Sequence, residues 1–125
     1  MFLKLAHTQL EVYPIASDLV YEVYTLTAQF PPQEKFGISS QMQRAALSVL
    51  LNLAEGSARK SPTERLRFYE IGRASLVELD TALSIAEALS YFTPKDYPKL
   101  EEMVVTTFKK ISLLIKSTKE SPKTH

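Results

Sequence analysis

The chain has 125 residues, of which 45% are apolar and 23% are charged, and its formal net charge is +1. This length suits one domain with a single core. The composition argues against a disordered chain, and the small net charge argues against a polycation that binds any nucleic acid without a local basic site. Cysteine is absent, which excludes disulfides and thiolate catalysis and favours a reducing compartment.

The N-terminus and the apolar runs predict where the protein acts. The opening residues, MFLKLAH, lack the basic region, the long apolar stretch and the small-residue cleavage site of a signal peptide. No apolar run in the sequence is long enough to cross a membrane. We therefore expect a cytoplasmic protein that does not bind membranes.

The first helix is expected over about residues 13–30. Apolar side chains recur there every three or four residues, and Pro14 suits the first turn of a helix, where its missing N–H is not needed. Pro31 and Pro32 follow the last apolar position. Because proline cannot continue a helix, this pair predicts the end of the segment.

The second helix is expected over about residues 39–58, with Ser39 or Ser40 as its N-cap. Its apolar residues fall on most sides of the helix, since Leu47 and Leu51 lie away from the face that its other apolar residues form. A helix of this kind must be covered by its own bundle and by another subunit. It is the first indication of an oligomer.

The third helix is expected over about residues 62–90. Ser61 supplies an N-cap, Pro62 a first-turn proline and Glu64 the carboxylate of a capping box. Its expected buried stripe consists of Phe68, Ile71, Ser75, Leu76, Leu79, Ala82, Leu83, Ala86 and Leu89.

The fourth helix is expected over about residues 97–117, with Asp96 as its N-cap. The tail 118–125 has no apolar anchor and is expected to fray. Four long helices with short connections bury their stripes most simply by packing antiparallel. We therefore predict an all-α protein, an up-down-up-down four-helix bundle that occupies residues 1–125 as one domain.

Catalytic sites find little support in the sequence. The only histidines, His7 and His125, lie near the two ends of the chain, so neither a Ser-His-Asp triad nor a di-iron site can be assembled in the core. The glycines Gly37, Gly56 and Gly72 are isolated and form no phosphate-binding loop. We expect no enzyme activity, no metal site and no cofactor.

Two of these glycines fall within or at the end of an expected helix, where glycine is less favourable than alanine by about 1 kcal/mol. We expect close approach of another backbone to explain Gly72. A helix end or a bend explains Gly56.

Polar residues form a line along the second helix, at spacings of four, three and four. They are Ser48, Asn52, Glu55 and Arg59. We expect them to bond to one another and to Ser75 and Glu78 of the third helix, because buried polar groups are normally paired. We hypothesise that Arg59 or Arg44 pairs with Glu78 or Glu70 and fixes the register of the bundle. A carboxylate acting as general base lacks a second titrating partner.

All five arginines lie within thirty residues, and a lysine joins them at the corner between the second and third helices. This window is net +3. Because the guanidinium group suits phosphate, the window is a candidate nucleic-acid site; the alternative is a solvated face. Its members are Arg44, Arg59, Lys60, Arg65, Arg67 and Arg73. A looser set on the fourth helix and tail is interpreted as solubilising: Lys109, Lys110, Lys116, Lys119 and Lys123.

Two stretches carry a family resemblance. QFPPQEKFGISSQMQRAALSV, followed by NLAEGSARKSPTERLRFYEIGRASLVELDTAL, closely resembles a family of small bacterial four-helix bundles linked to the intervening sequences of 23S ribosomal RNA genes. The resemblance begins at LEVY near the N-terminus and continues to the turn before the fourth helix. It implies a cytoplasmic, left-turning antiparallel bundle that assembles as a homopentameric ring, with no established enzymatic activity. Related accessory proteins of diversity-generating retroelements bind nucleic acid and a reverse transcriptase.

Matched by position, the family motif NxAEGxxR falls on the end of the second helix, and the basic opening of the third helix follows it. These residues are Asn52, Glu55, Gly56 and Arg59, and then Arg65, Arg67 and Arg73. The chain departs from the family at Leu50 and Leu51, a segment in which relatives commonly have a proline. Leucines let the helix run straighter and enlarge its apolar surface.

These observations lead to one hypothesis and one alternative. The hypothesis is a non-enzymatic, homo-oligomeric bundle, pentameric as the resemblance implies, that binds RNA or other nucleic acid through phosphate contacts from the basic residues. The alternative is a protein–protein adaptor or scaffold, such as an accessory protein of a reverse transcriptase, with no direct role in binding nucleic acid.

Overall fold

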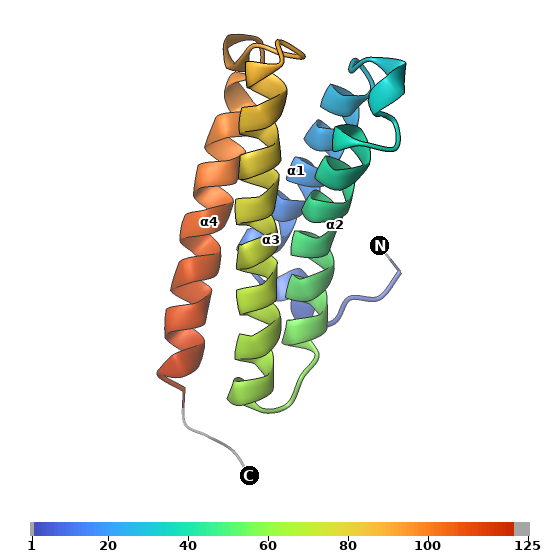
Figure 1. The fold of residues 1–125 in the computed structure, drawn as a ribbon. Helices are drawn as coiled ribbons and strands as arrows, with labels where there is room; N and C mark the ends of the chain where they lie inside the picture. Colours follow the sequence, from blue (N-terminus) through green and yellow to red (C-terminus); the bar gives the residue numbers. More distant parts are fainter. Residues whose placement is uncertain (1, 122–125) are drawn as a thin grey trace.

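The computed structural model describes residues 2–121 and contains four α-helices joined by short turns (Figure 1). No strand occurs in these residues, and the predicted all-α fold is confirmed. The helices are α1 (Val12–Thr27), α2 (Ile38–Ser57), α3 (Pro62–Ala88) and α4 (Pro98–Lys119). Three short 3₁₀ turns accompany them: η1 (Ala6–Gln9), η2 (Pro32–Glu34) and η3 (Pro94–Asp96).

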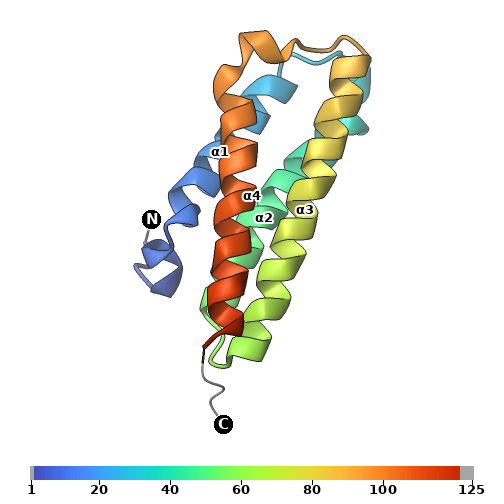
Figure 2. The same cartoon turned by 90° about the vertical axis from the view of Figure 1, so that its left-hand side faces the viewer.

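Successive helices run in opposite directions and surround one core. α2 packs against α1 and α3, and α4 packs against α3 and α1, so the four helices close a square (Figures 1 and 2). The corner at residues 58–61 and the C-terminal end of α4 therefore lie at the same end of the bundle (Figure 1). The turns that contain η2 and η3 lie at the other end.

Every helix contributes apolar side chains to the core. The fully buried ones include Leu19, Val23 and Leu26 of α1, Met42, Val49 and Leu53 of α2, Leu76 and Leu79 of α3, and Ile111 of α4. Thr107 lies among them, and its hydroxyl has no hydrogen-bond partner in the described part of the chain. Thr27, Ser39 and Thr118 are also buried, and the rest of the core consists of apolar side chains, as expected for an antiparallel bundle.

The start of α3 shows the predicted N-cap and first-turn proline but not the Glu64 carboxylate bond of a capping box among the described residues, whereas the start of α4 lacks its predicted cap. The Ser61 hydroxyl accepts a hydrogen bond from the Glu64 N–H at 3.2 Å, so Ser61 is the predicted N-cap. The prediction of Asp96 as the N-cap of α4 is wrong. Asp96 belongs to η3, and Tyr97 occupies the N-cap position without a side-chain bond.

The start of α2 also differs from the prediction. Neither Ser39 nor Ser40 is the N-cap, because the helix begins one residue earlier, after Gly37. The carboxylate of Glu34 accepts a long hydrogen bond, 3.4 Å, from the N–H of Ile38. The Glu34 side chain, upstream of the helix, thus accepts a bond from the first turn of α2, a role that we assigned to a serine.

The other helix ends differ from the predicted bounds by a few residues. α1 stops at Thr27, before Phe30, and α4 continues to Lys119, two residues beyond its expected end. The first two residues of the expected frayed tail, 118–125, are therefore helical. Residues 122–125 of that tail lie outside the described residues.

The buried face of α3 is rotated from the predicted stripe. Ile71 and Leu89 were expected in the core, but they are 42% and 51% exposed. Tyr69 and Gly72 are buried in their place. The Tyr69 ring packs directly against Gly56 of α2.

Candidate nucleic-acid interface

The corner between α2 and α3 is fastened by Arg65. Its Nη1 donates hydrogen bonds to the carbonyl oxygens of Arg59 at 3.1 Å and of Lys60 at 2.9 Å. These carbonyls follow the C-terminus of α2, where backbone acceptors have no partner within the helix. Arg65 therefore stabilises the corner, and its guanidinium is less available to an external ligand than its sequence position suggests.

Arg59 is also engaged within the protein. Its guanidinium lies 4.7 Å from the centre of the Phe68 ring and 3.6 Å from the Glu55 carboxylate, one turn earlier in α2. Both side chains of this ion pair are about half exposed, so the pair contributes little to stability. Phe68 is half-buried rather than part of the core, and the stack covers the ring.

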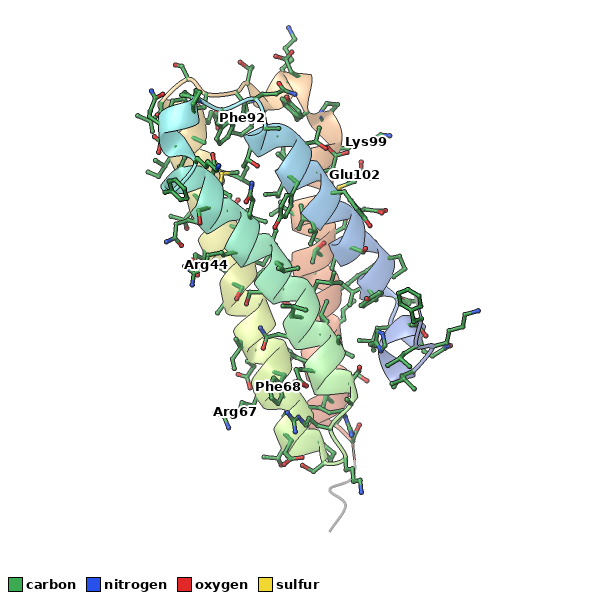
Figure 3. All side chains as sticks on the ribbon, turned by 90° about the vertical axis from the view of Figure 1, so that its right-hand side faces the viewer. Arg44, Arg67, Phe68, Phe92, Lys99 and Glu102 are labelled. Carbon is green, nitrogen blue, oxygen red and sulfur yellow. The ribbon has the colours of Figure 1, made fainter. Side chains whose placement is uncertain are left out.

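Two basic side chains at the corner remain free. Lys60 and Arg67 are exposed, and neither forms an ion pair within residues 2–121. Arg67 points outward near the lower end of the bundle (Figure 3). These two side chains are the members of the predicted cluster that are best placed to reach a ligand.

The other two arginines of the predicted cluster lie away from the corner. Arg73 donates a hydrogen bond to Ser112 of α4 at 3.1 Å and lies 5.9 Å from the Phe108 ring. Arg44 is far along α2, toward the opposite end (Figure 3). The six predicted residues are therefore not one patch: four gather at the corner, one joins α3 to α4, and one stands apart.

Lysines of α4 reach the corner end, which the sequence analysis missed. α4 returns antiparallel to α3, so Lys116 and Lys119 in its last turn lie at the same end as Lys60 and Arg67 (Figure 1). We interpreted these lysines as a solubilising face. The signal that could have placed them is the length of the fourth helix, because a helix of 22 residues returns along most of its neighbour.

The bundle is strongly polarised in charge along its axis. Two contacts mark its middle: the hydroxyls of Ser48 and Ser75 are 2.8 Å apart, and Arg73 bonds Ser112. On one side lies the corner end, residues 48–75 and 109–121, with nine Lys or Arg and four Asp or Glu, net +5. On the other lies the far end, residues 14–47 and 76–108, with four Lys or Arg and nine Asp or Glu, net −5. Residues 2–13 carry one Lys and one Glu, which cancel, and their Glu11 pairs with Lys110 of the corner end. The small net charge of the chain conceals this separation.

The predicted polar line forms two separate groups. The side-chain amide of Asn52 donates to the carbonyl oxygen of Ser48 at 2.8 Å and to its hydroxyl at 3.1 Å, and Ser48 bonds Ser75 across to α3. Glu55 and Arg59 pair with each other instead.

The ion pair that we expected between α2 and α3 is absent from the described residues. Arg59 is held within its own helix by Glu55 and Phe68, and Arg44 contacts neither Glu78 nor Glu70 within 4 Å. Glu78 is therefore not part of a structural network. The uncharged bond between Ser48 and Ser75 joins the two helices at this level, and Asn52 bonds Ser48 within α2.

Gly56 lies at the end of α2, as predicted, but the close approach that we expected at Gly72 occurs at Gly56 instead. A Cβ on Gly56 would lie 2.7 and 2.9 Å from ring atoms of Tyr69 and 3.0 Å from the Cβ of Phe68. A Cβ on Gly72 would lie 3.4 Å from Asn52 and 3.5 Å from the Val49 carbonyl oxygen, which is ordinary contact. Close approach therefore requires glycine at position 56, where the motif AEG ends α2.

The tyrosine that packs on Gly56 has a perturbed phenol. Burial raises the pKa of Tyr69, and the positive charge of Arg65 partly opposes this shift. Tyr69 therefore stays neutral well above physiological pH. Its ring is part of the packing that holds the corner, and its ionisation plays no part in binding near pH 7.

The far end is held by aromatic rings and uncharged donors. Phe30 packs against Tyr91 and Phe92, with ring centres 5.4 and 6.3 Å away. The Tyr91 hydroxyl donates to the Glu34 carboxylate at 2.6 Å, and this bond is the main reason that the pKa of Tyr91 is raised. None of these contacts involves a basic side chain. Lys35, at the same end, lies 5.5 Å from the centre of the exposed ring of its neighbour Phe36.

The described part of the chain offers neither a metal site nor a membrane span. No group of three or more His, Cys, Asp or Glu residues there is arranged to hold a metal ion. None of the helices in residues 2–121 combines the length and the apolar character needed to cross a membrane.

Comparison with known proteins identifies a family. Residues 8–113 match the 23S rRNA-intervening sequence protein family. A crystal structure of a protein of unknown function from the S23 ribosomal protein family of Bacteroides thetaiotaomicron superposes with a TM-score of 0.77. The two share 18% identity over 90% of this chain and 99% of that one, which is evidence for a common fold. No curated protein matches this chain. The chain belongs to the 23S rRNA-intervening sequence protein family.

Proposed function

We propose that the chain is a non-enzymatic, cytoplasmic, self-associating bundle that binds RNA through phosphate contacts at its corner end. The observation that carries this proposal is the separation of charge, net +5 at the corner end against net −5 at the far end. A local positive field of this kind attracts phosphate, although the whole chain is almost neutral. The family's link with 23S rRNA favours RNA as the nucleic acid.

The free basic side chains determine the mode of binding. Lys60, Arg67, Lys116 and Lys119 are exposed and have no ion-pair partner within residues 2–121. Arg59 covers the Phe68 ring, so we do not expect this ring to stack on bases. Contacts to phosphate position a nucleic acid without reading its sequence. Affinity should therefore fall steeply with salt and depend weakly on base identity.

The outer face of α2 and α3 supports self-association. Leu47, Leu51 and Ile71 are exposed there, beside a hollow of about 390 Å³ that Arg44 and Glu78 also reach. Neither charged residue has an ion-pair partner in the described chain, so each is free to pair with a second copy. Assembly as a ring of five, which the family resemblance implies, would place several corner ends near one RNA.

The test of RNA binding is a fluorescence titration of a labelled RNA hairpin with the purified protein. The test variant reverses two free charges at the corner, Lys60→Glu/Arg67→Glu. The matched control reverses two at the far end, Lys35→Glu/Lys99→Glu, with the same change in net charge. Arg65 is left intact because its bonds to the Arg59 and Lys60 carbonyls stabilise the fold.

The proposal predicts that the corner variant binds at least about tenfold more weakly at 50–100 mM salt, while the far-end control stays within about threefold of the parent protein. Light scattering on each sample checks that the oligomer is intact. An equal loss of RNA affinity in both variants would mean that net charge alone explains the binding. No binding by the parent protein would contradict the proposal and favour an adaptor that contacts proteins only.

Self-association is tested separately with Leu47→Ser/Leu51→Ser. This variant should lower the mass measured by light scattering, because it removes apolar contacts from the proposed interface. Val77→Ser/Val105→Ser, which changes two exposed residues between α3 and α4, serves as the control and should leave the mass unchanged. Equal masses for the parent and for the α2 variant would contradict an interface on this face.

A further inference from the structure

A long groove runs between α3 and α4 on the face away from α1 and α2. It consists of two adjoining hollows of about 300 and 240 Å³ that share Asp80, Val104 and Val105. The first continues toward Phe92 and Pro94 at the far end, and the second continues toward Phe108. We call the two together the α3–α4 groove.

The groove is lined by apolar side chains that the bundle leaves partly exposed. Val77, Val105 and Phe108 are 51%, 44% and 41% exposed, although all three lie in the middle of long helices. Leu83 and Leu100 form a deeper part of the same surface. Contiguous apolar surface of this kind on a folded domain marks an interaction site.

The charges beside the groove have opposite signs at its two ends. Asp80, Glu87 and Glu101 line its far-end half, and none of these carboxylates has an ion-pair partner within residues 2–121. Arg73 and Lys109 stand near its other end, where Arg73 lies over the Phe108 ring. An occupant of the groove therefore meets negative charge at one end and positive charge at the other.

We propose that the α3–α4 groove binds an amphipathic helix of a partner protein, with basic residues at the end of that helix that lies against Asp80, Glu87 and Glu101. A groove between two packed helices accepts a third helix through apolar residues spaced by three and four. From Arg73 to Glu87, α3 rises about 21 Å at 1.5 Å per residue, so the matching helix has about fourteen residues.

Charge complementarity selects this occupant over the other classes. The unpaired carboxylates repel the phosphates of RNA and of anionic lipid, whereas a basic helix end neutralises them. The groove also lies outside the α2–α3 face assigned above to self-association. The protein would then bind RNA at one end and hold a basic segment of a second protein toward the other, and either activity could fail without the other.

The test uses a fluorescent fourteen-residue helical peptide as the probe. Leucines at positions three and four residues apart form its apolar face, three lysines lie near one end, and two glutamates lie near the other. One control peptide replaces the lysines with glutamates, and a second replaces the leucines with serines. A peptide that simply reverses the charge order is not a control, because it can bind in the opposite direction.

The proposal predicts that the lysine peptide binds at least about tenfold more tightly than either control at 100 mM salt. Asp80→Asn/Glu101→Gln in the protein should weaken binding at least about fivefold. The matched control is Asp18→Asn/Glu102→Gln, which makes the same charge change beside the neighbouring hollow between α1 and α4. Affinity for the RNA hairpin should not fall in either variant, which separates this site from the corner end.

Four results would overturn the proposal. One is no binding of the lysine peptide, and another is equal binding of the lysine and glutamate peptides. The third is an equal loss of affinity in the Asp80 and Asp18 double variants. The fourth comes from light scattering of Val77→Ser/Val105→Ser, which tests whether a second copy of this chain occupies the groove. If the oligomer of this variant dissociates, the groove is an interface between copies, and the proposal of a separate partner fails.

Discussion

The two ends of the bundle are stabilised by different interactions. At the corner end, cationic side chains hold the chain together: Arg65 bonds two carbonyl oxygens, and Arg59 stacks on Phe68. At the far end, aromatic rings pack together and Tyr91 bonds Glu34. The comparison shows that a basic residue near a candidate site must be sorted by what it already contacts. Charge alone would have predicted that Arg65 and Arg67 are equally available to a ligand.

The largest expected effect tests the packing that is special to the corner end. Gly56→Ala should destabilise the protein by about 2 kcal/mol, because the new Cβ would overlap the buried ring of Tyr69. Gly72→Ala is the matched control on α3. It should be neutral or stabilising by up to about 1 kcal/mol, because its Cβ meets only ordinary contacts and alanine favours a helix. Urea denaturation measures both, and equal losses would contradict the assigned roles.

The second prediction distinguishes Arg65, which stabilises the corner, from Arg67, which is free to bind a ligand. Arg65→Ala should lower the free energy of unfolding by about 1 kcal/mol, because the Arg59 and Lys60 carbonyls of the turn after α2 lose two charge-assisted bonds. Arg67→Ala should change it by less than about 0.5 kcal/mol. For RNA affinity the order should reverse, with the larger loss in Arg67→Ala. If Arg67→Ala unfolds as readily as Arg65→Ala, the distinction is wrong.

A smaller effect is expected at the far end, where α3 ends in a left-handed residue. Ser90 has φ of 63°, and Tyr91 N–H bonds the Ala86 carbonyl at 3.0 Å to complete the cap. Ser90→Gly should stabilise the protein by about 0.5–1 kcal/mol, because glycine adopts this conformation without steric strain. Thermal unfolding should show a rise in Tm. A fall would mean that the serine side chain makes a stabilising contact.

The last prediction concerns stability at alkaline pH, where one tyrosine at each end loses its proton. No effect is expected at neutral pH. Tyr91 at the far end and Tyr69 at the corner both have a pKa above the ordinary value of 10.0. The folded state therefore holds these protons more tightly than the unfolded state. This stabilisation is complete below about pH 10 and is lost as pH rises through the folded pKa.

Denaturation at pH 8 and at pH 10.5 should show a smaller loss of stability in Tyr91→Phe than in the parent protein, because the variant lacks the proton held by the bond to Glu34. Tyr69→Phe should also reduce the loss of stability at alkaline pH, because it removes the buried phenol. An unchanged alkaline loss in both variants would show that other groups dominate this pH range.

The four helices and the antiparallel fold were predictable because apolar periodicity and proline-bearing turns are local features. Ser61 is an example, since its cap depends only on residues within the next turn. The contacts between helices were not predictable in the same way. The close contact at Gly56 depends on where Tyr69 of α3 meets α2. From the sequence alone we assigned the close approach to Gly72 instead.

The candidate site was predicted in part for the same reason. The run of arginines identifies the corner, but it does not show that Arg59 and Arg65 are engaged or that Arg73 reaches across to α4. The contribution of Lys116 and Lys119 arises from the return of α4 to the corner. Contacts between segments distant in sequence decided which basic groups are free.

The most direct test of the central assignment is lysine footprinting by mass spectrometry with and without the RNA hairpin. Both ends carry lysines, so each protein molecule contains its own control. The account predicts that RNA protects Lys60, Lys116 and Lys119 from acylation and leaves Lys35, Lys95 and Lys99 unchanged. Equal protection at both ends, or protection confined to the far end, would contradict the assignment of RNA binding to the corner end.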